Sequence, residues 1–246
     1  MSSGAEIALQ RARYARMRWN TPLSAAHAAE LLQQLDVAGA ETILDLGCGW
    51  GELLLRAVAA GGPSPRTGVG VDRDEALLER GRAAADTRGL GHAVRFVAGA
   101  AEDWDEAAQR VMCIGAGHAW GGDAEALAAL ARVVAPGGRL LFGDGCWERP
   151  PTPAAAKLFG PGVLPLAQLT AAARAAGWRV LHLSTADQRE WDAFESSWRA
   201  GREEWLAAHA DHPDAPALRD ELDALLTEYL DVYRGVLGFA YLVLTR

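Results

Sequence analysis

A glycine-rich stretch at residues 43–51, reading Ile-Leu-Asp-Leu-Gly-Cys-Gly-Trp-Gly, is the segment of this chain best suited to bind a ligand. An apolar run leads into it and a helical pattern follows it. Glycine takes positive φ at little cost and lets a ligand approach the main chain, while the first helical N–H groups are free to bind. Asp72 ends the next apolar run, where a carboxylate can accept hydrogen bonds from both ribose hydroxyls. These residues together predict a nucleotide-like cofactor.

The charges around the glycines indicate which cofactor fits. A dinucleotide fingerprint has a third glycine where this chain has Glu52, and a carboxylate in the first helical turn repels a pyrophosphate. S-adenosylmethionine carries no phosphate and is positively charged at its reactive sulfonium. Asp45, just before the glycines, can attract its amino group. The sequence favours the methyl donor, with a dinucleotide as the alternative.

The rest of the chain must position this loop, and it alternates β-branched runs with Ala- and Leu-rich helical stretches. This alternation is typical of an α/β fold, here a mostly parallel seven-stranded sheet with helices on both faces. We expect strands at residues 42–46, 67–71, 94–98, 111–115, 139–143, 178–184 and 239–245. We expect helices at residues 52–60, 74–88, 124–134 and 165–176.

Two stretches fall outside the alternation. Residues 1–40 predict a helical N-terminal cap, broken at Pro22, with Ser24 capping its second helix. Residues 187–238 predict a helical insertion before the last strand, which acts as a lid. Its aromatic and leucine stripes are expected to be packing faces. We therefore expect one domain over residues 1–246, with the cofactor-binding core at residues 41–184 and the last strand at 239–245.

These motifs resemble those of the class I S-adenosylmethionine-dependent methyltransferases, which have a Rossmann-like fold. The similarity covers residues 20–184, and residues 239–245 match the family's last, antiparallel strand. The resemblance implies that the loop glycines and Cys48 line the methionine part of the cofactor, that Asp72 binds the ribose and that Arg73 lies beside the adenine. Ala100 stands where the family often has Asp. The contact to the adenine then comes from Glu102 or Asp103 and from the Ala101 backbone N–H. The implied cofactor residues are Asp45, Gly47, Cys48, Gly49, Gly51, Asp72, Arg73, Ala101 and Glu102.

The methyl acceptor should bind beyond the carboxyl ends of the strands, as ligands of open parallel sheets do. His118 follows the fourth strand and is the candidate general base, because neutral imidazole can accept a proton from the acceptor. The alternative is a loop histidine bonded to the backbone. Trp120 and Trp147 predict an aromatic wall, or plain packing under the lid. The candidates for the substrate side are Tyr14, Trp19, His118, Trp120, Trp147 and Glu148, with Asp144 as a further possible anchor.

Composition limits the compartment and the partners. The formal net charge is −8, which disfavours broad nucleic-acid binding. The N-terminus lacks an apolar signal segment and no run is long enough to span a membrane. Three scattered cysteines predict neither a zinc site nor a disulfide framework. We expect a cytoplasmic protein, and the Ala, Arg and Gly bias suggests a bacterial source. Four residues in one loop, His209, Asp211, His212 and Asp214, resemble metal ligands, but the nearby prolines favour an irregular turn without metal.

The resulting prediction is a methyltransferase acting on an oxygen, nitrogen or carbon nucleophile of a small molecule, as a monomer or a homodimer. One alternative is a non-catalytic S-adenosylmethionine-binding module, suggested by Ala100 and by the lack of a decisive base. Another is a methyltransferase acting on a macromolecule, which the acidic charge disfavours. An aminopropyl transferase is a third, and the sequence shows no acidic cluster for an amine substrate.

Overall fold

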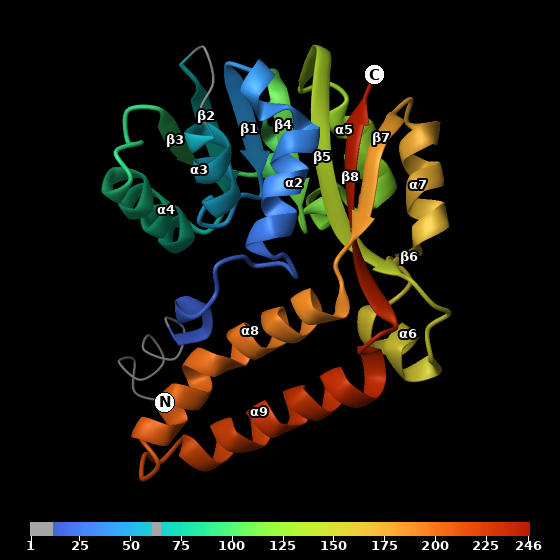
Figure 1. Cartoon of the computed structure of the whole chain (residues 1–246). Helices are drawn as coiled ribbons and strands as arrows, with labels where there is room; N and C mark the ends of the chain where they lie inside the picture. The colour runs from blue at the N-terminus through green and yellow to red at the C-terminus, as the bar shows by residue number, and fades with distance from the viewer. Residues whose placement is uncertain (1–11, 61–64) are drawn as a thin grey trace.

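The computed structural model describes residues 12–60 and 65–246, in which eight strands form one twisted sheet (Figure 1). The sheet order is β3-β2-β1-β4-β5-β8-β7, with β6 beside β5. Strand β8 is antiparallel to both of its neighbours, and the other pairings are parallel. The strands are β1 (Thr42–Leu46), β2 (Thr67–Asp72), β3 (Val94–Ala98), β4 (Ala108–Ile114), β5 (Val134–Trp147), β6 (Leu164–Pro165), β7 (Arg179–Thr185) and β8 (Leu237–Thr245).

Helices cover both faces of the sheet, which confirms the predicted fold class. Helices α2, α3 and α4 bury Leu31, Leu54 and Leu78 in one core, and α5 and α7 bury Leu127 and Leu169 in the other. The helices are α2 (Ala25–Leu35), α3 (Glu52–Ala59), α4 (Glu75–Thr87), α5 (Asp123–Leu130), α6 (Pro153–Phe159), α7 (Leu166–Ala175), α8 (Gln188–Ala208) and α9 (Ala215–Glu228). The described residues also include the short turns η1 (Val37–Gly39), η2 (Ala101–Asp103), η3 (Gly117–Trp120) and the π-helical η4 (Tyr229–Tyr233).

The structure departs from the predicted elements around the fifth strand. We expected a helix to continue to residue 134, but α5 ends at Leu130 and β5 already begins at Val134. The Pro136–Gly138 sequence, which suggested a turn, lies inside β5 where the register with β4 shifts and Gly137 has φ 71°. A bulge can hold proline and glycine within a strand. Helix α6 was missed because the prolines around its cap, Thr152, resemble a loop.

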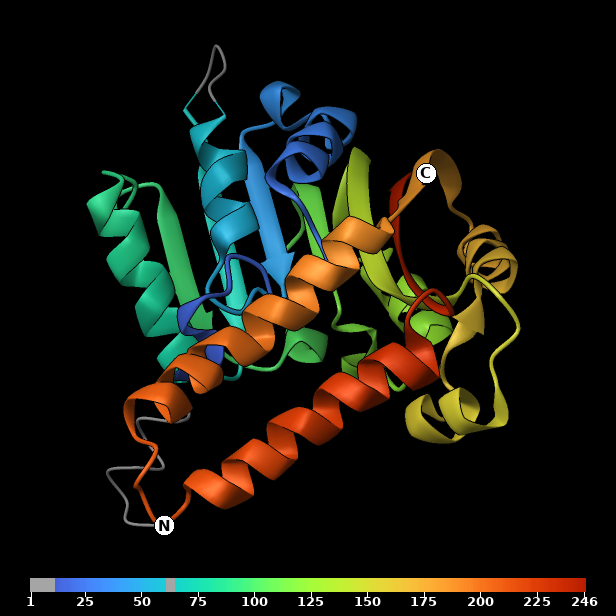
Figure 2. The same cartoon turned by 60° about the horizontal axis from the view of Figure 1, so that its bottom comes forward.

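The N-terminal segment and the late insertion meet at the carboxyl edge of the sheet. Ser24 caps α2 as predicted, and a helical turn at 12–15 is the described part of the first expected helix; residues 1–11 of that cap lie outside the described residues. Helices α8 and α9 form a long pair that extends past this edge (Figure 2). The outer part of the pair has its own small core of Leu206, Leu218 and Leu222, with Ala215. The insertion is therefore helical, as predicted.

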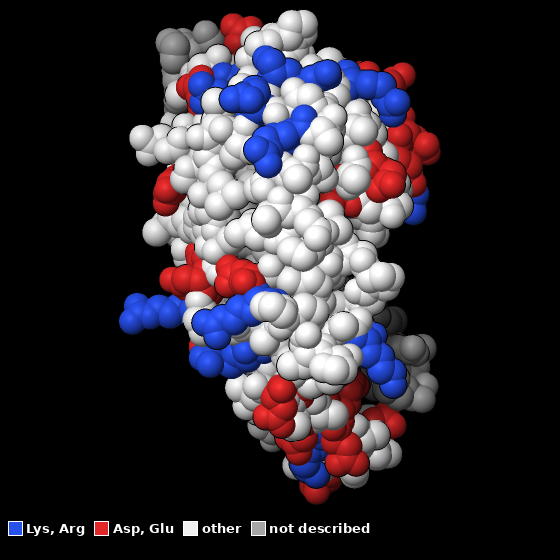
Figure 3. Space-filling view, turned by 90° about the vertical axis from the view of Figure 1, so that its right-hand side faces the viewer, with Lys and Arg blue, Asp and Glu red and all other residues white. Residues whose placement is uncertain are grey.

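Strand β7 is the last strand on one side of the sheet. Figure 3 shows this side of the molecule, and the middle of its surface carries few charged side chains. Leu181 and Leu183 of β7 are 50% and 41% exposed. The register with β8 shifts between Val180 and His182. Such a bulge makes an edge strand a poorer template for further pairing.

A hydrogen-bonded pair, Glu190 and His27, joins the insertion to the N-terminal segment. Glu190, at the start of α8, accepts hydrogen bonds from the Ser24 backbone N–H at 2.7 Å and from His27 Nδ1 at 3.0 Å. Its carboxylate also completes a capping box with Asp187. Burial alone would raise the pKa of Glu190, but the hydrogen bonds from His27 and Ser24 outweigh it and lower the pKa to about 2.

We expect Glu190→Ala to lower the free energy of unfolding by about 1–3 kcal/mol at neutral pH, because it leaves buried donors without an acceptor. The carboxylate pKa is depressed in the folded state. Its stabilisation is therefore present above about pH 4.5 and is lost as the pH falls toward 2. Urea unfolding at several pH values measures both effects. Glu203→Ala, at an exposed position of the same helix, is the control. Equal stability of the two variants at pH 7 would contradict the role assigned to Glu190.

Candidate active site

A cavity of about 430 Å³ opens at the carboxyl ends of β1, β2 and β4. It is lined by all the predicted cofactor residues except Gly51, namely Asp45, Gly47, Cys48, Gly49, Asp72, Arg73, Ala101 and Glu102. These residues come from the ends of neighbouring parallel strands, as expected for an open α/β sheet. The structure thus brings together in space the residues that the sequence separates.

The glycine loop has the backbone geometry that its sequence predicts. Gly47, Gly49 and Gly51 have φ values of 74°, 55° and 64°. The backbone N–H groups of Gly47 and Cys48 both donate to the Val71 carbonyl of β2, which fixes the loop to the neighbouring strand. Gly51 differs from the prediction, because it is buried and a Cβ on it would stand 2.4 Å from Phe96 Cε1. Its role is close packing at the start of α3, not lining the cavity.

Asp72 supports the loop as well as facing the cavity. One carboxylate oxygen accepts the Gly49 backbone N–H at 2.7 Å, and the other accepts the Asp74 N–H at 2.9 Å. Each carboxylate oxygen can accept more than one hydrogen bond, so both remain able to bind hydroxyl groups. The geometry fits the predicted contact with a ribose.

At the far end of the cavity, Arg73 forms an ion pair with Oε1 of Glu102. The second oxygen, Oε2, is buried and has no hydrogen-bond partner among the described residues. A buried unpaired acceptor costs free energy unless a ligand satisfies it, and the amino group of an adenine is such a donor. Asp103 is exposed and does not line the cavity, which leaves Glu102 as the fitting candidate.

Asp45 is 6% exposed, at the end of β1. Burial, and then the charge of Asp72, raise its pKa to about 7. A cationic ligand beside it would favour the ionised form. The protonation of Asp45 is therefore linked to cofactor binding.

From this linkage we expect affinity for S-adenosylmethionine to rise with pH and to level off above about pH 8. Below the pKa of Asp45, binding must displace a proton, so affinity falls by up to about tenfold per pH unit. Calorimetric titration between pH 6 and 8 measures the slope. Asp45→Asn should bind more weakly at pH 8 and lose this slope. A variant that keeps the wild-type slope would assign the titration to another group.

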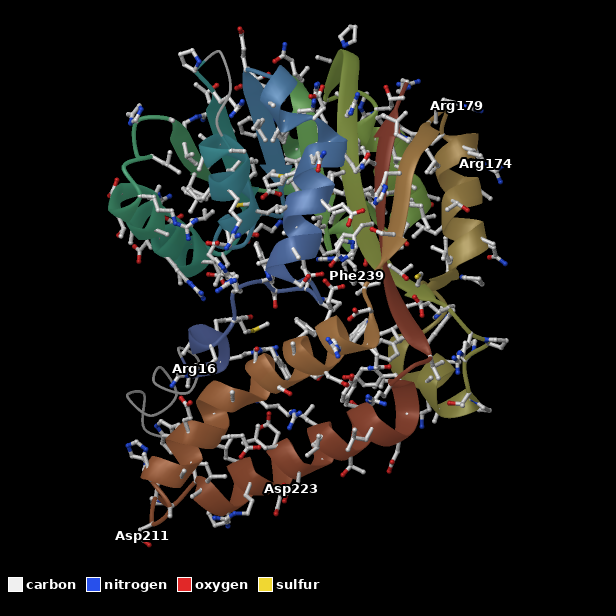
Figure 4. All side chains as sticks on the ribbon, in the orientation of Figure 1. Arg16, Arg174, Arg179, Asp211, Asp223 and Phe239 are labelled. Carbon is white, nitrogen blue, oxygen red and sulfur yellow. The ribbon has the colours of Figure 1, made fainter. Side chains whose placement is uncertain are left out.

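His118 and Trp19 are the predicted substrate residues that line the cavity. His118 is exposed on η3, and Trp19 lies in the N-terminal segment with the Arg56 guanidinium 4.8 Å from its ring centroid. The cavity wall between β4 and His118 is formed by small residues, Gly115 and Ala116. Phe239 of β8 (Figure 4) lies next to Gly115, since a Cβ on Gly115 would stand 4.0 Å from the Phe239 ring.

The side chains of the other predicted substrate residues do not line the cavity. Trp120 packs against the core on the α5 and α7 side, and Trp147 is buried with its ring 5.9 Å from that of Phe159. Tyr14 packs on Trp50, with ring centroids 5.7 Å apart. Packing, the alternative stated for the two tryptophans, is what the structure shows. Glu148 is exposed and packs over Gly238. The Asp144 carboxylate accepts a hydrogen bond from the Gly117 N–H of η3.

An irregular segment from Arg18 to Leu23, called the strap below, forms much of the remaining wall and was not predicted as such. Arg80 of α4 holds its start by donating to the Tyr14 and Met17 carbonyls at 3.0 and 2.8 Å. Trp50 Nε1 donates to the Arg18 carbonyl at 3.0 Å, and the Arg80 guanidinium lies 4.1 Å from the Trp50 ring centroid.

At its other end, the Tyr241 hydroxyl donates to the Pro22 carbonyl at 2.8 Å and contacts the Thr21 hydroxyl at 3.0 Å. The sequence feature that could have predicted the strap is Pro22, just before α2. This helix runs antiparallel to β1, so it must begin at the carboxyl edge of the sheet.

The insertion supports the strap without lining the cavity. Arg16, beside α8 in Figure 4, pairs with Glu204 at 2.8 Å. Arg13 lies 4.9 Å from the Trp198 ring centroid, and a Cβ on Gly201 would stand 2.0 Å from the Ala12 carbonyl oxygen. The segment around Ala12 therefore crosses α8 at Gly201, where any larger residue would clash with its backbone.

The two histidines of the loop between α8 and α9 make structural contacts within that loop and its flanking helix. The His209 ring stacks on Trp205 at 4.6 Å, and His212 Nδ1 accepts the Asp214 N–H at 3.2 Å. Over residues 12–60 and 65–246, no three His, Cys, Asp or Glu side chains are grouped so as to hold a metal ion. Within the same residues, no helix is both long and apolar enough to cross a membrane.

Comparison with known proteins agrees with the geometry. The sequence profile of a methyltransferase domain matches residues 43–138. The uncharacterized protein YjhP of Escherichia coli is 29% identical over 234 residues, covering 92% of this chain and 93% of YjhP. The crystal structure of YjhP superposes with a TM-score of 0.84 at 28% identity, covering 96% of this chain and 98% of YjhP.

Two further solved structures cover this chain nearly end to end. The S-adenosylmethionine-dependent methyltransferase of Geobacter sulfurreducens has a TM-score of 0.86 and 27% identity, and that of Thiobacillus denitrificans has 0.85 and 28%. Each comparison covers 96% of this chain and 97% of the other. Both structures contain S-adenosyl-L-homocysteine, the product that the methyl donor leaves behind. The chain therefore has a methyltransferase domain and the Rossmann-like fold of the class I S-adenosylmethionine-dependent methyltransferases, and it is an enzyme that uses S-adenosylmethionine as its methyl donor.

Proposed function

We propose that this enzyme methylates an oxygen, nitrogen or carbon nucleophile of a small molecule and that His118 is its general base. The observation that carries the proposal is the cavity of about 430 Å³, which His118, the cofactor residues and the strap line together. A volume of this size is ordinary for a small-molecule site, which must also hold the cofactor. The net charge of −8 further disfavours a polyanionic acceptor such as RNA.

S-adenosylmethionine supplies a methyl group activated by the adjacent sulfonium. The protein's task is to hold the acceptor in line with this methyl group, which can supply much of the rate enhancement. Trp19 and the strap cover the cavity and keep water away. His118 accepts the proton that an alcohol, phenol or ammonium acceptor must lose.

The cofactor residues have separate roles in this proposal. The glycine loop binds the methionine part, with Asp45 attracting its amino group. Asp72 accepts the ribose hydroxyls, and Arg73 and Glu102 hold the adenine. The insertion acts as the outer layer of a lid, because it holds the segments on both sides of the strap through the Arg16–Glu204 and His27–Glu190 pairs.

Incubation with methyl-labelled S-adenosylmethionine and a panel of alcohols, phenols, amines and carbon acids tests the acceptor class. Total RNA and unfractionated protein are included as competing acceptors. Transfer to one small-molecule class supports the proposal. Transfer to RNA or protein alone would overturn it.

The cytoplasm is the location we propose. Cys48, Cys113 and Cys146 are all free thiols, as expected in a reducing compartment.

A further inference from the structure

Two carboxyl groups, those of Asp123 and Asp144, meet beside Gly117, which lies between the cavity-lining residues Ala116 and His118. A Cβ on Gly117 would stand 2.5 Å from Asp123 Oδ1 and 2.9 Å from Asp144 Oδ2. The Gly117 N–H donates to Asp144 Oδ2 at 3.1 Å, and the Gly145 N–H donates to Asp144 Oδ1 at 2.8 Å. A larger residue at Gly117 would displace at least one of the two carboxyls, so the small residue here allows the start of α5 to approach β5 closely.

The surroundings oppose two negative charges at this place. Asp123 is buried and Asp144 is partly buried. The other titratable groups that face them are Glu125 of α5, Cys113 of β4, Cys146 of β5 and His118 of η3. Burial, and then the charge and hydrogen bond of Asp144, raise the pKa of Asp123 to about 7, and burial raises that of Asp144. Two carboxyls in contact commonly hold one proton between them.

The turn that these carboxyls hold carries part of the active site. Gly117 begins η3, and the next residue, His118, lines the cavity together with Ala116 and Ala119. Ala116 also packs against the cofactor loop, since a Cβ on Gly47 would stand 2.4 Å from its Cβ. A shift of η3 would therefore move His118 and release the support of the glycine loop together.

We propose that Asp123 and Asp144 are positioning residues that share one proton across Gly117, and that this hydrogen bond holds η3 and His118 at the cavity wall. Neither residue lines the cavity. The proposal rests on the proposed function only in so far as His118 acts as the base. When the shared proton is lost, two like charges repel each other across the turn and loosen it.

Hydrogen exchange of the peptide spanning residues 115–122 tests this without any acceptor. After correction for intrinsic rates, we expect protection in the wild type to fall about tenfold or more between pH 6 and pH 9. Asp123→Asn should stay protected at both pH values, because its amide donates to the Asp144 carboxylate without titrating. Asp123→Ala should be poorly protected throughout. Glu125→Gln, which removes a neighbouring charge on the same helix but keeps the pair, should follow the wild type.

Protection that does not change with pH in the wild type would overturn the proposal, as would an Asp123→Asn variant that loses protection at high pH. Carbon-13 NMR of the wild-type carboxyl groups adds a measurement that needs no variant. We expect the resonances of Asp123 and Asp144 to shift together in a step above the usual range of aspartate. Independent titration of both groups near their ordinary values would also overturn it. If the pair behaves as expected and His118→Ala leaves turnover unchanged, only the role of His118 in the proposed function fails.

Discussion

Replacing His118 with alanine is expected to lower turnover by about 10²–10⁴-fold, the range typical for loss of a general base. The side chain lies exposed at the cavity wall, where it can reach an acceptor. Affinity for S-adenosylmethionine should change little, because the cofactor residues lie at the ends of β1 and β2 and on the loops after β1, β2 and β3. Steady-state kinetics with the acceptor found by the labelling screen, combined with calorimetric titration of the cofactor, separates the two quantities.

His92→Ala is the matched control for this variant, since it removes an exposed histidine that does not line the cavity. Equal losses of turnover and cofactor affinity would instead indicate a structural histidine.

Replacing Asp72 with alanine is expected to weaken cofactor binding by about 1–3 kcal/mol, or roughly 5–150-fold. The carboxylate is available to accept ribose hydroxyls, and it also fixes the Gly49 N–H at 2.7 Å. The variant therefore loses ligand contacts and loosens the loop that holds the methionine part. Asp72→Asn keeps one acceptor oxygen and should be intermediate.

Asp74→Ala distinguishes binding from stability. Asp74 caps α4 by accepting the Ala76 and Leu77 N–H groups, but it does not line the cavity. It should lower the melting temperature and leave cofactor affinity nearly unchanged. If Asp72→Ala behaves as Asp74→Ala does, its carboxylate supports the fold and does not bind the ribose.

The elements around the cofactor were the most predictable from the sequence. Strands β1 and β3 match their expected bounds, and β2 extends by one residue to Asp72. Short buried strands of a parallel sheet are mostly apolar, so the ends of an apolar run in the sequence predict the bounds of the strand. The fifth strand was harder, because Pro136 and Gly137 suggest a turn unless the partner strand is known to shift register beside them.

The side chains of the acceptor side were the least predictable. Trp120 and Trp147 follow strands β4 and β5 just as functional residues do, yet they point into cores on opposite faces of the sheet. The strap was overlooked because Arg80, its main support, looks like an ordinary polar helix residue. Its importance depends on carbonyl groups more than sixty positions away.

By itself, the sequence determined the fold class, the cofactor loop and the identity of the methyl donor. These depend on local chemistry, namely glycines with positive φ, a carboxylate at a strand end, and a period of apolar residues. Only the tertiary structure decided which aromatic residues pack, how the strap and insertion cover the cavity, and that Asp123 and Asp144 meet below His118. Those features depend on contacts between distant segments, and which segments meet is set by packing that no local pattern records.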